Sequence, residues 1–242
     1  MTVGASENCW AVVPAAGAGR RMGSEIPKQY LPLGERCILE HTLSALADCP
    51  RISGIYVAIA DGDPYWTKLH LPDDWRVVTV AGGAERAYSV LNALEALLAG
   101  PADARDWVLV HDAARPCLRR DDLECLIDIA GGHSVGGILA RAVADTVKRV
   151  SRDGEIVETV DRSGLWYAQT PQMFRLSMLR DALANGLTAG LALTDEASAM
   201  ECAGWTPIVV EGHAENVKVT APQDLELART YLTQRSLQAD SL

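Results

Sequence analysis

The chain has 242 residues, a formal net charge of −10 and 48% hydrophobic residues. This apolar content excludes a disordered chain, and the acidic balance argues against a surface that binds nucleic acid. Since the length suits one sizeable core, we expect a single domain over residues 1–242. No apolar run approaches the ~20 residues of a membrane span, and the N-terminus does not resemble a signal peptide, so we expect a cytoplasmic protein with no membrane partner. The six cysteines lack C-x-x-C pairing, which favours reduced, mostly buried thiols over a zinc site or a disulfide framework.

The first element is a short apolar run at residues 10–13, which is typical of a buried strand. It leads into small residues at 14–19, whose backbone amides can approach an anion closely. Arg20, Arg21 and Lys28 follow within a few residues. In an acidic chain, cations beside a glycine loop indicate a polyphosphate ligand.

Two common phosphate-binding loops are excluded by the spacing. A Walker A loop would need Lys and then Ser or Thr directly after the last glycine, but Arg20 follows Gly19. A dinucleotide-binding fingerprint would need its third glycine one place before Gly23, and Pro27 and Pro32 prevent a long helix. A glycine-rich surface turn with solvated arginines remains the alternative.

Helices and strands alternate from this loop to residue 143. The apolar periodicity predicts helices over 35–48, 84–98 and 121–130, and strands over 52–60, 77–80, 107–110 and 137–143. The nearly all-apolar strand at 107–110 is expected to be central in a parallel sheet. The alternation predicts an α/β protein with helices on both faces of a mostly parallel, twisted sheet.

A hairpin signal interrupts this alternation. Predicted strands over 146–150 and 155–160 flank a Ser-Arg-Asp-Gly turn at 151–154. Because both legs are half polar, we expect residues 141–165 to form a projecting β-hairpin arm that a partner surface covers. A solvated edge hairpin on the main sheet is the alternative.

The end of the chain is predicted to contain short strands over 207–211 and 216–219. A capping box at 220–223, with an early proline, predicts the start of a last helix over 224–235. The polar residues 236–242 are expected to form a disordered tail.

Ligands of open α/β sheets bind beyond the carboxyl ends of the strands. There, strand 77–80 leads to Gly83, with Arg86 and Ser89 entering the next helix. Gly83 and Ser89 are therefore candidates for ligand contacts.

Strand 107–110 leads to an acid and an arginine, Asp112 and Arg115. Asp112 could hold Mg²⁺ directly or through water, or accept ribose hydroxyls, and Arg115 suits a substrate phosphate. A turn-capping role is the alternative for Asp112. We interpret the adjacent His111 as structural, because no second His–Asp cluster supports a metal-dependent phosphohydrolase.

Seven sequence blocks then occur in a characteristic order: G-x-G-x-R-M-G…P-K-Q-Y, G-G-A-E-R-A-x-S-V, V-H-D-A-A-R-P, D-T-V-K, D-R-x-x-L-W, Q-T-P-Q and N-V-K-V-T. Together they cover nearly the whole chain. In this order the sequence closely resembles the sugar-phosphate cytidylyltransferase family.

The resemblance implies a Rossmann-like nucleotidyltransferase fold, Mg²⁺ as cofactor and a homodimer formed through the hairpin arm. It implies transfer of CMP from CTP to 2-C-methyl-D-erythritol 4-phosphate, with release of pyrophosphate, in isoprenoid precursor synthesis. Ribitol 5-phosphate as the acceptor is the alternative. A dinucleotide-dependent oxidoreductase is disfavoured by the loop spacing, and a non-catalytic nucleotide-binding regulator would not need cations far from the loop.

The same resemblance assigns site residues. Arg21 and Lys28 are expected to stabilise the transition state. The residues expected to position substrates are Arg162, Lys218, Arg115, Thr146 and Thr170. The residues expected to bind the nucleotide are Ala15, Ala16, Gly17, Gly19, Gly83, Ser89 and Asp112. Some relatives carry an acid after the glycine pair, where this chain has Ala84.

Overall fold

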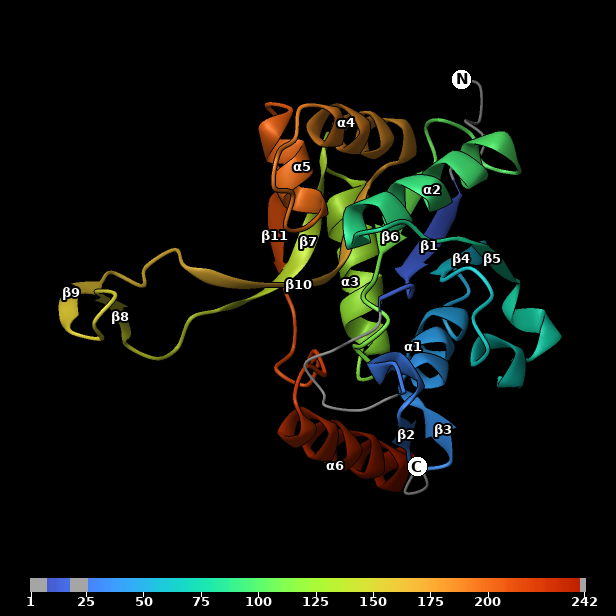
Figure 1. Cartoon of the computed structure of the whole chain (residues 1–242), viewed down its shortest axis with the longest axis horizontal. Helices are drawn as coiled ribbons and strands as arrows, with labels where there is room; N and C mark the ends of the chain where they lie inside the picture. The colour runs from blue at the N-terminus through green and yellow to red at the C-terminus, as the bar shows by residue number, and fades with distance from the viewer. Residues whose placement is uncertain (1–7, 18–25, 240–242) are drawn as a thin grey trace.

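The computed structural model describes residues 8–17 and 26–239. Its main sheet has seven strands in the order β11-β7-β10-β6-β1-β4-β5 (Figure 1). These strands are β1 (Cys9–Pro14), β4 (Gly54–Ile59), β5 (Val77–Ala81), β6 (Trp107–Val110), β7 (Gly136–Ala142), β10 (Trp166–Arg175) and β11 (Ile208–Glu211). All neighbours pair in parallel except β10, which runs antiparallel to both β6 and β7. The predicted mostly parallel sheet is confirmed. β6 is central as expected, although one of its two neighbours is antiparallel.

Helices cover both faces of this sheet. They are α1 (Ile38–Ala47), α2 (Arg86–Ala99), α3 (Arg120–Gly131), α4 (Leu176–Thr188), α5 (Glu196–Cys202) and α6 (Pro222–Ala239). Strand β1 alternates between two buried clusters, with Val13 in the one that contains Leu43 of α1 and Val12 in the one that contains Leu94 of α2. Side chains of a strand alternate between faces, so β1 contributes to a core on each side of the sheet. No helix in the described part of the chain combines the length and apolar character needed to cross a bilayer.

The predicted start of the first helix, at residue 35, is wrong for a local reason. Helix α1 begins at Ile38, because the preceding residues form a small hairpin of β2 (Pro32–Leu33) and β3 (Arg36–Cys37). The Q-T-P-Q block at 169–172 lies inside β10.

The predicted strand over 216–219 is also wrong. None of its residues forms a strand, and within the described residues its one long-range backbone hydrogen bond runs from the Val219 amide to the Ala114 carbonyl at 2.8 Å. Side chains provide its other anchors: the Asn216 amide donates to the Thr170 carbonyl at 2.8 Å, and Arg115 donates to the Asn216 carbonyl at 2.7 Å.

The last helix starts at Pro222, two residues before the predicted start, and its cap is not the predicted one. The carboxylate of Asp224, not the Gln223 side chain, accepts from the backbone amide and hydroxyl of Thr220, both at 2.8 Å, and from the Ala221 amide at 2.9 Å. Helix α6 continues to Ala239, so the start of the predicted tail is helical. Residues 240–242 lie outside the described residues.

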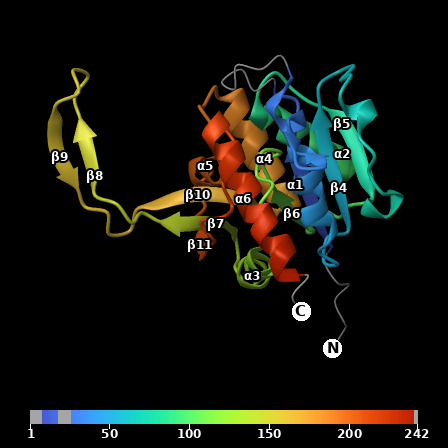
Figure 2. The same ribbon diagram turned by 90° about the horizontal axis from the view of Figure 1, so that it is seen from below.

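Strands β8 (Val147–Val150) and β9 (Ile156–Val160) form a separate two-stranded sheet. Figures 1 and 2 both show this hairpin extending away from the main sheet on two long connections. The edge-hairpin alternative is wrong, since neither strand joins the main sheet. Val150, Ile156 and Val157 are 56%, 66% and 64% exposed, so the described chain leaves apolar side chains of the arm uncovered.

Candidate active site

A cavity of about 310 Å³ lies where β1, β5 and β6 end. We call it the loop cavity, because the segment after β1 forms one wall. It is lined by Pro14, Ala15, Ala16, Gly17, Lys28, Gln29, Gly83, Ala84, Glu85, Arg86, Ser89, Asp112, Ala113, Ala114, Lys218 and Thr220. Eight of the predicted site residues are therefore brought together here: Ala15, Ala16, Gly17, Lys28, Gly83, Ser89, Asp112 and Lys218.

The wall after β1 is shaped by a residue that the sequence analysis did not single out. Gln29 is 4% exposed, and its amide nitrogen donates to the carbonyls of Ala15 at 2.6 Å and Gly17 at 3.1 Å. Two carbonyls are thereby turned toward Gln29, which fixes the path of the backbone beside the cavity. The sequence signal that could have identified Gln29 is its place in the P-K-Q-Y block.

The glycine pair after β5 is required by close approach. A Cβ on Gly82 would lie 2.3 Å from the Cβ of Ala16, and a Cβ on Gly83 would lie 2.3 Å from the Cβ of Tyr88. The Gly83 amide donates to the hydroxyl of Ser89 at 3.0 Å, which links the turn to helix α2. The glycines therefore let β5 and α2 approach β1 closely enough to form a narrow cavity.

Two lysines from distant segments reach the loop cavity. Lys28 begins a short 3₁₀ helix (Lys28–Tyr30), and its Nζ donates to the Val219 carbonyl at 3.0 Å. Val219 is fully buried in a small cluster beneath α6, whereas its neighbours Lys218 and Thr220 line the cavity. This alternation explains the N-V-K-V-T block: the valine anchors the segment and the residues on either side face the site.

Asp112 is the most highly paired residue of the cavity. Its Oδ1 lies 3.0 Å from Nε of Arg86, and its Oδ2 lies 3.0 Å from Nζ of Lys218 and 3.3 Å from Nε of Arg115. Although burial opposes it, the charges of Arg86, Lys218 and Arg115 hold the pKa of Asp112 far below its usual range. The cavity therefore contains a carboxylate that is ionised at neutral pH and fixed in position.

A second cavity, of about 170 Å³, lies beside the first, and we call it the β10 cavity. It is lined by Arg86, Asp112, Arg115, Ala168, Gln169, Thr170, Gln172, Thr194, Asp195 and Lys218. The predicted residues Arg115 and Thr170 lie here. Arg86, Asp112 and Lys218 line both cavities, so these three side chains form a shared wall.

His111 and Thr170 support this wall from behind. The Thr170 hydroxyl oxygen accepts from the Asp112 amide at 3.0 Å and lies 2.9 Å from Nδ1 of His111. Nε2 of His111 lies 3.2 Å from the Arg115 carbonyl, which can only accept, so Nε2 donates and Nδ1 accepts from Thr170. Burial lowers the pKa of His111 to about 4, so its imidazole is neutral at physiological pH. This arrangement agrees with the structural interpretation of His111.

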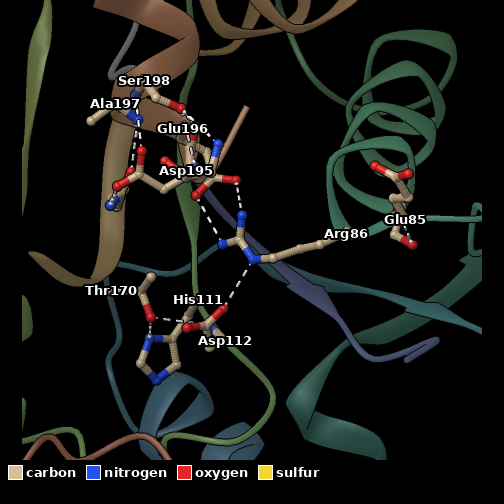
Figure 3. A network of polar contacts seen from close by, with 12 residues as sticks. Glu85, Arg86, His111, Asp112, Thr170, Asp195, Glu196, Ala197 and Ser198 are labelled. Carbon is tan, nitrogen blue, oxygen red and sulfur yellow. Dashed lines mark hydrogen bonds and ion pairs between the residues drawn. The ribbon is translucent and has the colours of Figure 1, made fainter. Parts of the chain in front are cut away.

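Behind Arg86 lies a second residue that the sequence analysis did not identify, Glu196 at the start of α5. Its carboxylate is fully buried and pairs with both terminal nitrogens of Arg86, at 2.6 and 3.0 Å (Figure 3). Burial alone would lower the pKa of Arg86, but the charges of Glu196 and Asp112 together raise it above the ordinary value. Burial raises the pKa of Glu196 and Arg86 opposes this, yet two donated N–H groups on two oxygens require the ionised carboxylate.

Several predicted residues are not brought to either cavity. Thr146 and Arg162 lie at the base of the arm, and there Arg162 donates to the Ala144 carbonyl. Gly19 and Arg21 lie outside the described residues. The roles assigned to these four residues remain predictions.

A resident metal cage is not present among residues 8–17 and 26–239, where no three His, Cys, Asp or Glu side chains cluster. The donor set at the shared wall is instead a single ionised carboxylate, Asp112. Mg²⁺ keeps several waters and is often bound through one or two carboxylates together with substrate phosphates. The residues present therefore fit an ion that arrives with a phosphate ligand.

Comparison with known proteins adds to this geometry. Residues 9–234 match the sequence profile of the family described as IspD, 2-C-methyl-D-erythritol 4-phosphate cytidylyltransferase. A 2-C-methyl-D-erythritol 4-phosphate cytidylyltransferase of Pseudomonas fluorescens Pf0-1 is 55% identical over 226 residues, which cover 93% of this chain and 96% of the relative. A crystal structure of 4-diphosphocytidyl-2C-methyl-D-erythritol synthase superposes with a TM-score of 0.81 at 40% identity, over 94% of this chain and 100% of that one. The Francisella tularensis enzyme superposes with a TM-score of 0.77 at 40% identity, over 93% and 99% of the two chains.

Proposed function

The chain belongs to the 2-C-methyl-D-erythritol 4-phosphate cytidylyltransferase family and forms 4-diphosphocytidyl-2-C-methyl-D-erythritol from CTP in the methylerythritol phosphate pathway, and we propose that its two cavities hold one substrate each. The loop cavity takes CTP and the β10 cavity takes 2-C-methyl-D-erythritol 4-phosphate. The observation that carries this division is the shared wall of Arg86, Asp112 and Lys218.

Three features support CTP in the loop cavity. It is the larger of the two cavities, it is lined by Gly83 and the small residues 15–17, and Lys28 also lines it. Backbone amides and a lysine are the groups that bind polyphosphates in proteins. We assign Lys28, together with Arg21 of the loop, to the charge that develops on the α-phosphate and the leaving pyrophosphate.

The β10 cavity suits the smaller polyol phosphate. Lys218 is 38% exposed at its side chain and stands at the wall between the cavities, so its charge can face a phosphate from either side. The side chain of Arg115 is 10% exposed and pairs with Asp112 and the Asn216 carbonyl. We therefore assign it to stabilising the wall and not to direct binding of the phosphate. Thr170 holds the Asp112 backbone from the same side.

The reaction is an in-line displacement. An oxygen of the acceptor phosphate attacks the α-phosphorus of CTP, a new P–O bond forms, and the bond to the β-phosphate oxygen breaks as pyrophosphate leaves. A phosphate monoester with a second pKa near 6 is already mostly ionised at pH 7, so no general base is needed. The chain's contribution is to position two anions and to neutralise charge, which lysines and backbone donors can do. The neutral, buried His111 takes no part in proton transfer to the substrate.

Asp112 is the residue that we assign to Mg²⁺, directly or through a water ligand. When bound, the ion would neutralise phosphate charge and order the triphosphate. Asp112 keeps the negative charge available for this purpose because Arg86, Arg115 and Lys218 keep it ionised.

We further propose that the chain acts as one domain in a homodimer formed through the arm. β1 and β11, from the two ends of the chain, lie in the same sheet, which supports a single domain. The exposed Val150, Ile156 and Val157 give the arm an apolar surface for a second copy. In such a dimer, Arg162 and Thr146 of one copy would complete the β10 cavity of the other.

Pyrophosphate release tests the substrate assignment. CTP with 2-C-methyl-D-erythritol 4-phosphate and Mg²⁺ should release pyrophosphate, while ATP, GTP and UTP should support far less. Robust turnover with ribitol 5-phosphate and none with 2-C-methyl-D-erythritol 4-phosphate would overturn the assignment of the acceptor.

A further inference from the structure

One buried charge of the fold lies outside both cavities and yet is connected to their shared wall. Glu196 lines neither cavity and is fully buried. Its carboxylate accepts hydrogen bonds from both terminal nitrogens of Arg86 (Figure 3). The remaining guanidinium nitrogen of Arg86, Nε, donates to Asp112 at 3.0 Å. A single side chain therefore separates Glu196 from the carboxylate that both substrates are proposed to approach.

The position of Glu196 is itself fixed by strand β10. The side-chain oxygen Oε1 of Gln172 accepts from the Ala197 backbone amide at 2.8 Å, and its side-chain nitrogen Nε2 donates to Oδ2 of Asp195 at 2.9 Å. Asp195 in turn caps α5 by accepting from the Ser198 amide at 2.9 Å. The same strand carries Thr170, which holds the Asp112 backbone. β10 thus anchors both ends of the chain of contacts that runs from Glu196 through Arg86 to Asp112.

The charges along this chain of contacts indicate different roles for Arg86 and Lys218. Asp112 and Glu196 together contact three cations, Arg86, Arg115 and Lys218, so this group of five side chains keeps one net positive charge. Arg86 is held between the two carboxylates, and both of its terminal nitrogens are committed to Glu196. Lys218 pairs with Asp112 and is the more exposed of these two cations, with 38% of its side chain exposed against 29% for Arg86. Arg86 therefore links the two carboxylates and holds them in place, and Lys218 carries the charge that faces the phosphates.

We propose that Glu196 is a positioning residue for CMP transfer, which holds Arg86 and, through Arg86, sets the position of Asp112 between the two substrates. The proposal rests on the assignment of the two cavities given above. Without the Glu196 charge, the terminal nitrogens of Arg86 lose their partner and can turn to Asp112 or to substrate phosphates. Anion binding then persists or strengthens, while the arrangement used in the transition state is lost.

The test compares Glu196→Gln with Glu201→Gln, the same change at an exposed site on the same helix. We expect Glu196→Gln to lower kcat roughly ten- to hundredfold, the scale for a small misplacement of a reacting group. The KM for CTP should not rise, and calorimetry should still find one CTP site per chain. Glu201→Gln should match the wild type. A folded Glu196→Gln variant that loses CTP sites in proportion to its lost activity would overturn the proposal.

A double-mutant cycle tests the route through Arg86. Arg86→Gln should lower kcat by itself, and adding Glu196→Gln should cause no further loss, because the intermediary is already gone. Equal losses in both backgrounds, or full kcat in Glu196→Gln, would overturn the proposal. If Glu196→Gln alone fails to fold, the double variant replaces it in the test, because it removes both members of the buried Glu196–Arg86 pair and leaves no unpaired charge. Its kcat is then compared with that of Arg86→Gln. A lower kcat in the double variant would contradict the route through Arg86.

Failure of the cavity assignment has a separate signature. A fully active Lys218→Ala variant would show that the shared wall is not needed for the reaction, and the proposal for Glu196 would fail with it. An inactive Lys218→Ala variant with a fully active Glu196→Gln variant would reject only the role of Glu196.

Discussion

Nζ of Lys218 lies 3.0 Å from Oδ2 of Asp112, and both residues line the two cavities. Asp112 follows the central strand β6, whereas Lys218 lies on the segment before α6. Their contact joins the carboxyl end of the sheet to the last segment of the fold. The site is thus assembled from the first loop, the sheet and the C-terminal segment.

Lys28→Ala tests the charge assigned to the CTP side of the wall. We expect kcat to fall roughly 10²- to 10³-fold, the scale for removing one preorganised charge-stabilising group. The melting temperature should change little, since Lys28 lines the loop cavity and is absent from the buried apolar clusters of the described residues. Pyrophosphate release and circular dichroism measure the two effects. A variant that unfolds would show a structural role, and one with full kcat would show that Lys28 is not needed.

The neutral His111 makes stability depend on pH. Its pKa is about 4 in the fold against 6.5 for the free side chain, so the unfolded chain binds the proton first as pH falls. The contribution of His111 to stability is complete above pH 6.5 and is lost as pH falls from 6.5 toward 4, by about 3 kcal/mol in all.

His111→Gln checks this sign, because glutamine can donate to Arg115 and accept from Thr170 but does not titrate. Urea unfolding across this pH range should show the wild type losing stability relative to the variant. Parallel curves for the two proteins would contradict a buried neutral histidine.

The arm is predicted to hold the dimer together. Val157→Glu places a charge among its exposed apolar side chains, so the dimer should dissociate to monomers in light-scattering measurements after size exclusion. Val78→Glu, at an exposed position of the edge strand β5, is the matched control and should leave the oligomeric state unchanged. A Val157→Glu protein that keeps the wild-type mass would show that the arm is not the interface.

A mixed dimer tests whether Arg162 acts in the partner's site. Arg162 lies at the base of the arm and lines neither cavity of its own chain. Chains with Arg162→Ala, mixed with chains inactivated by Lys28→Ala, should regain activity on subunit exchange, because one site of each hybrid then has both residues. The ceiling is about half of the wild-type activity per hybrid dimer. Verified hybrids without any recovery, from folded parents, would place Arg162 in its own chain or outside the site.

Local patterns predicted the elements that carry their own signal. The apolar run at 107–110 matches β6, and the glycine pair at 82–83 matches a real steric requirement. The pattern at 216–219 is typical of a strand, but this segment pairs with no strand in the described part of the chain, which no local pattern reveals. Asp224 replaces Gln223 in the cap because the helix starts at Pro222.

The positioning residues were the hardest to predict. Glu196 lies in a stretch of small residues with no cation nearby in the sequence, and its partner Arg86 is supplied by a different helix. Gln29 likewise acts on carbonyls that only the fold brings within reach. Such residues are identified by their partners, and partners are a property of the tertiary structure.

The central claim is that the wall shared by the two cavities carries CMP transfer, and kcat/KM of Lys218→Ala measures it most directly. Lys68→Ala, at a lysine that lines neither cavity, is the matched control. We expect Lys218→Ala to lose roughly 10²- to 10³-fold in kcat/KM for 2-C-methyl-D-erythritol 4-phosphate while it remains folded, and Lys68→Ala to match the wild type. Wild-type kcat/KM in a folded Lys218→Ala protein would contradict the account.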